Sequence, residues 1–341
     1  MCTRPVAAEA CFEKAGLPVI IPAGMLRVLL LFGVFFTVCS NFTAGQQAWG
    51  GAYVSFDVAN DVFVLPIKTD RYFTGGVRLE VGKVANGRAP FRINSNASRT
   101  SYWRFTQDIF TPSQIEASEL LTNDRPFASY LTVSRGKTYG DDHIGLRLNT
   151  EWTAGILGKY SGGGMMQNAF HGMVDFADPL PGWKNEINTD LILNYRADLQ
   201  TMVAGSQQAR LFSRLQAQLG TLHIDIEPGL AFEWRAITLR PGRTLDVMLS
   251  ADARLVGYNA TLTGGLLNRD ERFRGIIQTL PLVGTAGLDV VVTFDGLRLC
   301  GGLRQLSPEF KGGEGHAWGY CGFRILPGWD AVTSARPNTR R

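Results

Sequence analysis

The sequence contains no apolar run long enough to cross a membrane as a helix. Its longest such run covers residues 28–38, whereas a spanning helix needs roughly 18 to 20 apolar residues. Basic residues are not gathered into blocks either, because 34 Lys and Arg against 30 Asp and Glu leave a net charge of only +4. These absences exclude a bundle of membrane-spanning helices and argue against a nucleic-acid partner.

Cysteine is scarce as well. Three of the five cysteines fall in an N-terminal segment that we expect to be removed, namely Cys2, Cys11 and Cys39. An oxidising compartment would permit a bridge between the remaining two, Cys300 and Cys321. However, Cys300 shares a strand face with Arg298, whereas Cys321 shares one with Phe323. We therefore predict two unpaired thiols and no disulfide framework.

The N-terminus has the pattern of a secretory signal. Arg27 precedes the apolar run 28–38, and small and polar residues follow it. We place the cleavage after Gly45, so that residues 1–45 form an N-terminal extension and a signal peptide. A start at Met25 is also compatible with this pattern. The alternative, a buried N-terminal helix, is less favoured because the charge, the apolar run and the small residues come in the order of a signal.

Beyond residue 46 the main pattern is alternation with period two, which is typical of strands with one apolar and one polar face. One face of such a segment carries Leu148, Trp152 and Ala154, and the other carries Asn149, Glu151 and Thr153. The same pattern predicts a strand from Ile187 to Leu199. Such segments recur from about residue 51 to residue 326, separated by turns such as Pro241-Gly242 and Asp295-Gly296.

Two architectures give this pattern: a soluble sandwich or barrel, and a transmembrane barrel with an apolar exterior. A mean hydropathy of -0.01 fits both. Many of the predicted strands are long, and export offers the outer membrane as a place for an apolar exterior. We therefore predict one domain over residues 46–326, a transmembrane barrel, followed by a polar tail over residues 327–341.

The first polar segment that could carry chemistry is Asn60-Asp61, at the end of the first predicted strand. The second strand begins near Thr69-Asp70 and continues through Thr74-Gly75-Gly76. Carboxylate, carboxamide and backbone oxygens near a glycine turn are the ligands that Ca2+ prefers. The alternative is an ordinary hairpin in which Asn60 and Asp61 cap the turn.

Two further segments stand out. Asp124-Arg125 precedes a proline, and on its own it is best interpreted as a structural ion pair that shapes a loop. Residues 162–171 turn through glycines into a stretch of helical composition that ends in His171, with Asp178 seven residues later. A neutral imidazole with a carboxylate behind it can act as a general base, although a solvated histidine is the simpler alternative. No nucleophile elbow and no zinc-protease motif is present.

Taken together, seven segments resemble, in order, the lipid A 3'-O-deacylase family of Gram-negative outer membranes. They are residues 58–61, 72–76, 107–112, 124–128, 155–158, 167–171 and 181–183. Two later segments, 257–262 and 307–310, also resemble strands of that family. Order and approximate spacing hold from about residue 52 to residue 326.

The resemblance implies an all-β fold, a transmembrane antiparallel β-barrel of about twelve strands with a short helix in an extracellular loop. It also implies a monomeric outer-membrane esterase whose substrate is the lipid A of lipopolysaccharide and whose cofactor is Ca2+. The bond cut would be the ester of the 3'-linked acyloxyacyl group. The site residues that match the family motifs are His171 as the general base, Asp178 behind it, Asp61 as the calcium ligand, Asn60 in the oxyanion hole and Thr74 in the lining.

Two departures from the family pattern concern charge. The family tends to place basic residues between the segments at 107–112 and 124–128, where they suit the phosphates of the head group. Here residues 113–123 contain Glu116 and Glu119 and no basic residue. Lys159 stands where the family usually has proline, and it would either supply the missing charge or remain solvated.

Two other functions are compatible with the fold class: a non-catalytic outer-membrane barrel, either a pore or a structural protein, and a soluble periplasmic lipid-binding barrel. The combination of Asn60, Asp61, Thr74 and His171 favours the esterase, since a pore has no need of all four.

Overall fold

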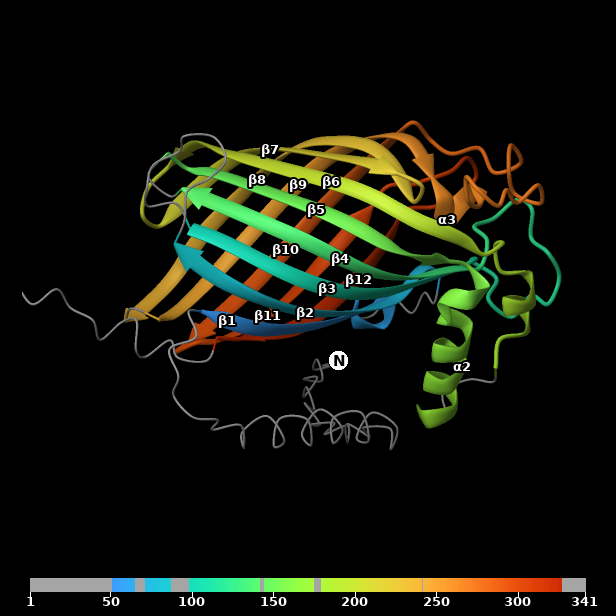
Figure 1. Cartoon of the computed structure of the whole chain (residues 1–341), viewed down its shortest axis with the longest axis horizontal. Helices are drawn as coiled ribbons and strands as arrows, with labels where there is room; N and C mark the ends of the chain where they lie inside the picture. The colour runs from blue at the N-terminus through green and yellow to red at the C-terminus, as the bar shows by residue number, and fades with distance from the viewer. Residues whose placement is uncertain are drawn as a thin grey trace, which may run out of the picture. The chain divides into compact units, whose positions relative to one another are not determined.

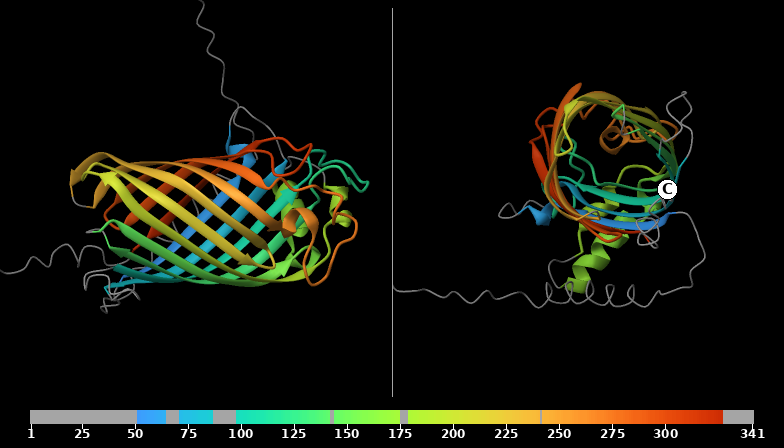
Figure 2. Two further views of the ribbon diagram at one scale, coloured as in Figure 1. Left: turned by 90° about the horizontal axis from the view of Figure 1, so that it is seen from above. Right: turned by 90° about the vertical axis from the view of Figure 1, so that its left-hand side faces the viewer.

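The computed structural model describes residues 51–64, 71–86, 98–141, 144–174, 179–240 and 242–326. Their strands form one closed antiparallel barrel of twelve strands, seen from the side in Figure 1 and end-on in Figure 2. The strands are β1 (Ala52–Asn60), β2 (Tyr72–Asn86), β3 (Ser98–Thr111), β4 (Ala128–Asp141), β5 (Leu146–Leu157), β6 (Asp190–Gly205), β7 (Ala209–Gly220), β8 (His223–Arg240), β9 (Arg243–Asn259), β10 (Leu282–Phe294), β11 (Leu297–Leu306) and β12 (His316–Ile325).

Short helices lie between some of the strands. They are η1 (Asp61–Phe63), η2 (Lys159–Ser161), α2 (Gly163–Val174), η3 (Pro181–Asn185) and α3 (Ala260–Thr263). Among the described residues, none of the helices is long and apolar enough to cross a membrane. The barrel, its approximate strand number and the helix predicted after residue 162 are thus confirmed.

The chain divides into two compact units. One consists of residues 47–169 and 179–341 and contains the barrel, and the other consists of residues 1–46 and 170–178. Of the second unit, only the helical backbone of residues 170–174 is described. The predicted signal peptide and the predicted C-terminal tail lie outside the described residues.

Closure of the barrel depends on pairing between the first and last strands. β1 pairs with β12 in an antiparallel register that runs from Val54↔Ile325 to Asn60↔Gly319. Every strand consequently has two neighbours, and the sheet has no open edge. A closed sheet satisfies its backbone groups internally, as hydrocarbon surroundings require.

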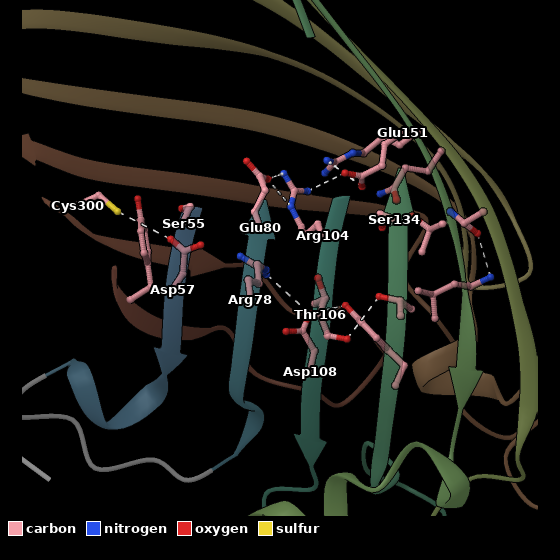
Figure 3. Close-up of a pocket in the computed structure, with 18 of the residues that line it drawn as sticks. Ser55, Asp57, Arg78, Glu80, Arg104, Thr106, Asp108, Ser134, Glu151 and Cys300 are labelled. Atoms are coloured by element: carbon pink, nitrogen blue, oxygen red, sulfur yellow. Dashed lines mark hydrogen bonds and ion pairs between the residues drawn. The ribbon is translucent and has the colours of Figure 1, made fainter. Parts of the chain in front are cut away.

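The apolar faces of the strands point outward. Along β5, Trp152 is 59% exposed while its neighbour Glu151 is 6% exposed and faces the lumen. Inside the lumen, Arg104 lies between Glu80 and Glu151, with nitrogen–oxygen distances of 2.7 and 2.8 Å (Figure 3). An apolar exterior around a polar interior is the arrangement of a membrane barrel, which settles the direction that alternation alone could not.

The two ends of the barrel differ in the length of their connections. At one end, β6–β7 and β10–β11 are joined by residues 206–208 and 295–296. The latter is the predicted Asp295-Gly296 turn, with positive φ at both residues. The opposite end carries the long segments 112–127, 158–189 and 264–281. Outer-membrane barrels place short turns in the periplasm and long loops outside, so the long-loop end is the extracellular rim.

A hydrophobic core lies across the mouth of the barrel at this rim. It gathers buried side chains from the rim ends of strands all around the sheet and from the long loops: Tyr72, Ala128, Leu157, Ile187, Ile192, Leu222, Ala260, Leu262, Phe273, Ile277 and Phe310. Ile187 is one of them, and β6 begins only at Asp190. The predicted strand start at Ile187 was therefore wrong, because burial in this core outweighs the local alternation.

The outward face gives a depth-dependent prediction. Val133 lies at the middle of β4 and Leu191 at the rim end of β6, and both side chains are exposed on the outside. Val133→Arg should destabilise the barrel in lipid vesicles by about 2–4 kcal/mol, whereas Leu191→Arg should cost about 0–1 kcal/mol. Equilibrium unfolding in vesicles measures both, and equal costs would contradict the proposed depth of the rim.

Candidate functional site

Asn60 ends β1 at the extracellular rim and starts η1. Its Oδ1 accepts a hydrogen bond from the Val62 backbone N–H at 2.8 Å, which fixes the orientation of the amide. In the sheet register Asn60 is opposite Gly75, on the outward face of the wall. A Cβ at residue 75 would stand 3.3 Å from the Asn60 Nδ2, so glycine leaves the amide nitrogen room at this point of the outer wall.

Asp61 follows Asn60, and its side chain is buried, with 1% exposure. Its Oδ2 accepts a hydrogen bond from the Arg71 backbone N–H at 3.0 Å, which ties the end of β1 to the start of β2. Asn60 therefore caps η1, and Asp61 holds the loop between β1 and β2. The same two residues that were predicted as site residues also have the turn-capping role of the alternative prediction.

Thr74 lies at an irregularity of β2. The register between β2 and β3 shifts between Phe73 and Gly75, so that Thr74 is the extra residue of a β-bulge. Its hydroxyl lies 2.6 Å from the hydroxyl of Thr111, and both residues are buried. Because Thr74 precedes Gly75, the partner of Asn60, the fold brings three of the five predicted site residues to one stretch of the rim.

The first turns of α2 lie against the wall next to this stretch. A Cβ at Gly163 would stand 2.2 Å from the Cβ of Ser129 on β4, and a Cβ at Gly164 would stand 2.7 Å from the ring of Trp183. The Trp183 Nε1–H donates to Gln167 at 2.9 Å. Two glycines thus allow close contact of α2 with β4 and η3.

His171 and Asp178 are the other two predicted site residues. His171 lies in α2 one helical turn after Gln167, but its side chain is outside the described part of the structure. Asp178 lies outside the described residues altogether. Their roles remain predictions.

A buried acid that the sequence did not point to lies under the start of α2. Glu186 accepts a hydrogen bond from the Ser129 hydroxyl at 2.5 Å, and that hydroxyl lies 2.6 Å from the Ser161 hydroxyl. Burial raises the pKa of Glu186 to about 7, although the Ser129 hydrogen bond and the charge of Lys159 lower it. Through Ser129 and Ser161, Glu186 therefore links the end of η3 to β4 and η2. Its raised pKa makes this contact sensitive to pH near neutrality.

Arg125 corrects one prediction from the sequence. Its backbone N–H donates to the Asp124 carboxylate at 2.7 Å, but its guanidinium does not pair with Asp124 and instead binds Glu309 at 2.5 Å and the Thr261 hydroxyl at 2.6 Å. Asp124 also accepts hydrogen bonds from the Ser113 backbone N–H and hydroxyl. Arg125 is 1% exposed, and removing one partner of such a buried pair typically costs about 3–5 kcal/mol. The pair therefore links the loop after β3 to α3 and to the segment between β11 and β12.

The lumen holds a cavity of about 560 Å³, lined mainly by polar and charged side chains. Arg78 lies 3.7 Å from Asp108. Figure 3 shows it directed toward Asp108, together with the ion pairs of Arg104. Among the described residues, no group of three or more His, Cys, Asp or Glu side chains is placed to hold a metal ion. The paired charges of the lumen are best explained as structural.

The side chains at the rim provide oxygen atoms, which are the ligands that a hard cation prefers. The Asp61 carboxylate and the Thr74 and Thr111 hydroxyls are oxygen donors at the same end of neighbouring strands. Calcium takes six to eight oxygens, so a single carboxylate would require carbonyl, water or substrate oxygens to complete the shell. The donor set fits Ca2+ better than a metal that prefers sulfur or nitrogen ligands.

The glycine contact of α2 can be tested by Gly163→Ala. The added methyl group must push α2 away from Ser129, at a local cost of about 1–3 kcal/mol. Amide hydrogen exchange over residues 163–169 should become faster while heat-modifiable migration of the barrel is unchanged. Gly172→Ala is the matched control in the same helix, since a Cβ there meets nothing within 4 Å. Equal effects of the two variants would refute the close contact.

Glu186 predicts a pH dependence of the same contact. Its pKa is raised on folding, so its stabilising contribution is complete below about pH 4.5 and is lost as the pH rises through about 7. Exchange protection of residues 159–164 and 181–186, corrected for intrinsic rates, should therefore be lower at about pH 8 than at about pH 5. Glu186→Gln still accepts from Ser129 and should remove this difference. A Glu186→Gln protein with the original pH dependence would show that another group titrates.

The chain is similar to several known proteins. The family model described as outer membrane protein LpxR matches residues 29–325. Among solved structures, LpxR from Salmonella typhimurium is similar with a TM-score of 0.67 and 16% identity, covering 80% of this chain and 99% of that one. The β domain of the Bordetella autotransporter BrkA has a TM-score of 0.47 and 11% identity, covering 81% and 99% of the two chains. No curated protein sequence matches.

The family match covers all twelve strands of the barrel and agrees with the resemblance carried by the seven segments. The likeness to the Salmonella structure independently supports the fold. The chain belongs to the outer membrane protein LpxR family and is an outer-membrane β-barrel of the lipid A deacylase type.

Proposed function

We propose that this protein is a Ca2+-assisted esterase that hydrolyses the 3'-linked acyloxyacyl ester of lipid A. The observation that carries the proposal is the meeting of Asn60, Asp61 and Thr74 at the extracellular rim, with Asn60 on the outward face of the wall. A lipid substrate in the outer leaflet would reach this face laterally, without entering the lumen. We also propose that the enzyme acts as a monomer, as the resemblance to the family implies.

Asn60 is suited to stabilise the oxyanion. Because its Oδ1 is held by the Val62 N–H, the amide orientation is fixed, and among the described residues its Nδ2 has no hydrogen-bond acceptor, so it would be placed to donate to the carbonyl oxygen of the ester. A donor held in place before the reaction stabilises developing charge without reorganisation, and such stabilisation commonly contributes more to the rate of acyl transfer than any other single effect. Thr74, held by Thr111, would line the same position.

His171 is the proposed general base. It follows Gln167 by one helical turn, in the helix whose first turns contact β4. A neutral imidazole there would take a proton from water, and Asp178 would orient the ring and stabilise its charged form. The Asp61 carboxylate would hold Ca2+, whose charge would polarise the ester carbonyl when bound.

The alternative function is a non-catalytic barrel, either a pore or a structural protein. The hydrophobic core across the mouth and the Arg125–Glu309 pair both obstruct the extracellular end of the lumen. Obstruction disfavours a pore. A structural protein is distinguished by the absence of any lipid product.

The central test is mass spectrometry of lipid A after incubation of the purified protein in detergent. The wild-type protein should release the acyloxyacyl group in the presence of Ca2+, and a chelator should stop release until Ca2+ is restored. His171→Ala should abolish release while the protein keeps its heat-modifiable migration. Undiminished release by this variant would remove His171 from the mechanism, and no release by the wild-type protein would favour the structural alternative.

Asn60→Asp gives a sharper test of the oxyanion role. Aspartate caps a helix as well as asparagine does, so the Val62 hydrogen bond should be kept while the N–H donor is lost. The rate of release should fall by about 10²- to 10³-fold. A variant that migrates as a folded barrel and retains full activity would contradict the proposed donor.

A further inference from the structure

Two segments far apart in sequence are joined at the entrance to β6. The Tyr160 backbone N–H donates to the Thr189 hydroxyl at 3.3 Å, and the Asn268 side-chain amide donates to the Thr189 carbonyl at 2.9 Å. The Asn188 side chain in turn donates to the Arg269 carbonyl at 3.2 Å. η2 and the loop that follows α3 therefore form one continuous surface at the rim.

The acidic groups inside this surface are already satisfied. Asp190 accepts from the backbone N–H groups of Leu267 and Asn268, at 2.8 and 3.0 Å. Asp270 pairs with Arg272 at 2.6 Å. Both acids are buried, so neither neutralises the basic side chains that are exposed on this surface.

Three other basic residues of these segments are exposed: Lys159, Arg269 and Arg274. One acidic residue, Glu271, is exposed in the same loop. The surface therefore presents an excess of positive charge. We call these three basic residues the basic rim.

Apolar side chains accompany the basic rim. Tyr160 and Leu267 are 78% and 68% exposed, and Leu191 and Leu193 continue the apolar exterior down β6. Cations above exposed apolar side chains match the boundary between head groups and acyl chains, where basic side chains meet phosphate while apolar groups enter the lipid. A soluble anion would make no contact with the exposed apolar side chains, whereas a lipid would contact both the charged and the apolar groups.

The basic rim and the proposed ester-cleaving residues lie at the same end of the barrel. β1 and β5 are four strands apart, which at about 4.8 Å per strand is roughly 19 Å along the wall. The first turns of α2 lie between them, against β4. A large lipid head group would reach from one to the other.

We propose that Lys159, Arg269 and Arg274 form a docking surface for the phosphate of an anionic glycolipid head group in the outer leaflet. The identity of the lipid as lipid A rests on the proposed function. The docking surface would take the place of the basic residues that are missing from residues 113–123, and it would hold the head group at the depth of Asn60.

The test measures binding without cleavage. Lys159→Ala/Arg269→Ala is introduced into His171→Ala protein, and its affinity for lipid A in nanodiscs is measured with a chelator present. Loss of two partly screened charge contacts should weaken binding by about tenfold. Lipid A stripped of its phosphates should bind the basic-rim variant and its parent equally.

A matched control has the same charge change at the opposite end of the barrel. Arg99 and Lys137 are exposed on the outer faces of β3 and β4 near the short turns, and Arg99→Ala/Lys137→Ala should bind as the parent does. Lys159→Arg/Arg269→Lys keeps both charges and should also bind normally. Heat-modifiable migration checks that every variant is folded.

Three results would overturn the proposal: equal weakening by the basic-rim and control variants, equal weakening for phosphorylated and stripped lipid, or displacement of lipid A by inorganic phosphate at matched ionic strength. None of these results depends on ester hydrolysis. If the proposed function fails while the phosphate-dependent binding persists, the docking surface stands and the reaction does not.

Discussion

Backbone groups inside a lipid bilayer find no water to bind, so each N–H and C=O must be paired within the protein. In this chain the requirement is met by closing the sheet, and the pairing of β1 with β12 completes it. Successive side chains of a strand point to opposite faces of the sheet, so in the closed barrel they face lipid and lumen in turn. The apolar Trp152 beside the buried Glu151 is a direct consequence of that constraint.

The lumen of the closed barrel is polar and keeps a cavity of about 560 Å³. Charged side chains placed in the lumen are costly unless paired, and Arg104 between Glu80 and Glu151 shows how the charges are satisfied. At the rim, the loops cover the mouth with an apolar core and the Arg125–Glu309 pair. With the rim end of the lumen covered in this way, the outer wall is the surface that a lipid can approach.

The candidate site on that wall depends on glycines, whose lack of a side chain allows neighbouring groups to come close. Gly75 leaves room for the Asn60 amide, and Gly163 and Gly164 allow α2 to approach β4 and Trp183. Glu186 and Ser129 hold the same contact from beneath. The catalytic proposal and the docking proposal share this rim, one on each side of the start of α2, so both use the depth that the barrel sets in the membrane.

Much of the architecture was determined by the sequence itself, because strand alternation, glycine turns and helical composition are local properties. The turn at Asp295-Gly296, the helix after residue 162 and the unpaired Cys300 and Cys321 were all predicted correctly. Asn60, Asp61 and Thr74 were singled out through the resemblance to a known family. Their common position at one rim follows from strand pairing.

Only the tertiary structure decided which face of each strand points outward and which distant groups meet. Arg125 and Glu309 are 184 residues apart, and the sequence around either residue does not predict that the two form a pair. Ile187 continues an alternating stretch yet lies in the core over the mouth. Glu186 acquires its raised pKa only through burial, which outweighs the opposing effect of the Ser129 hydrogen bond. Such pairings depend on the closure of the whole sheet, which is a property of the complete chain and not of any segment within it.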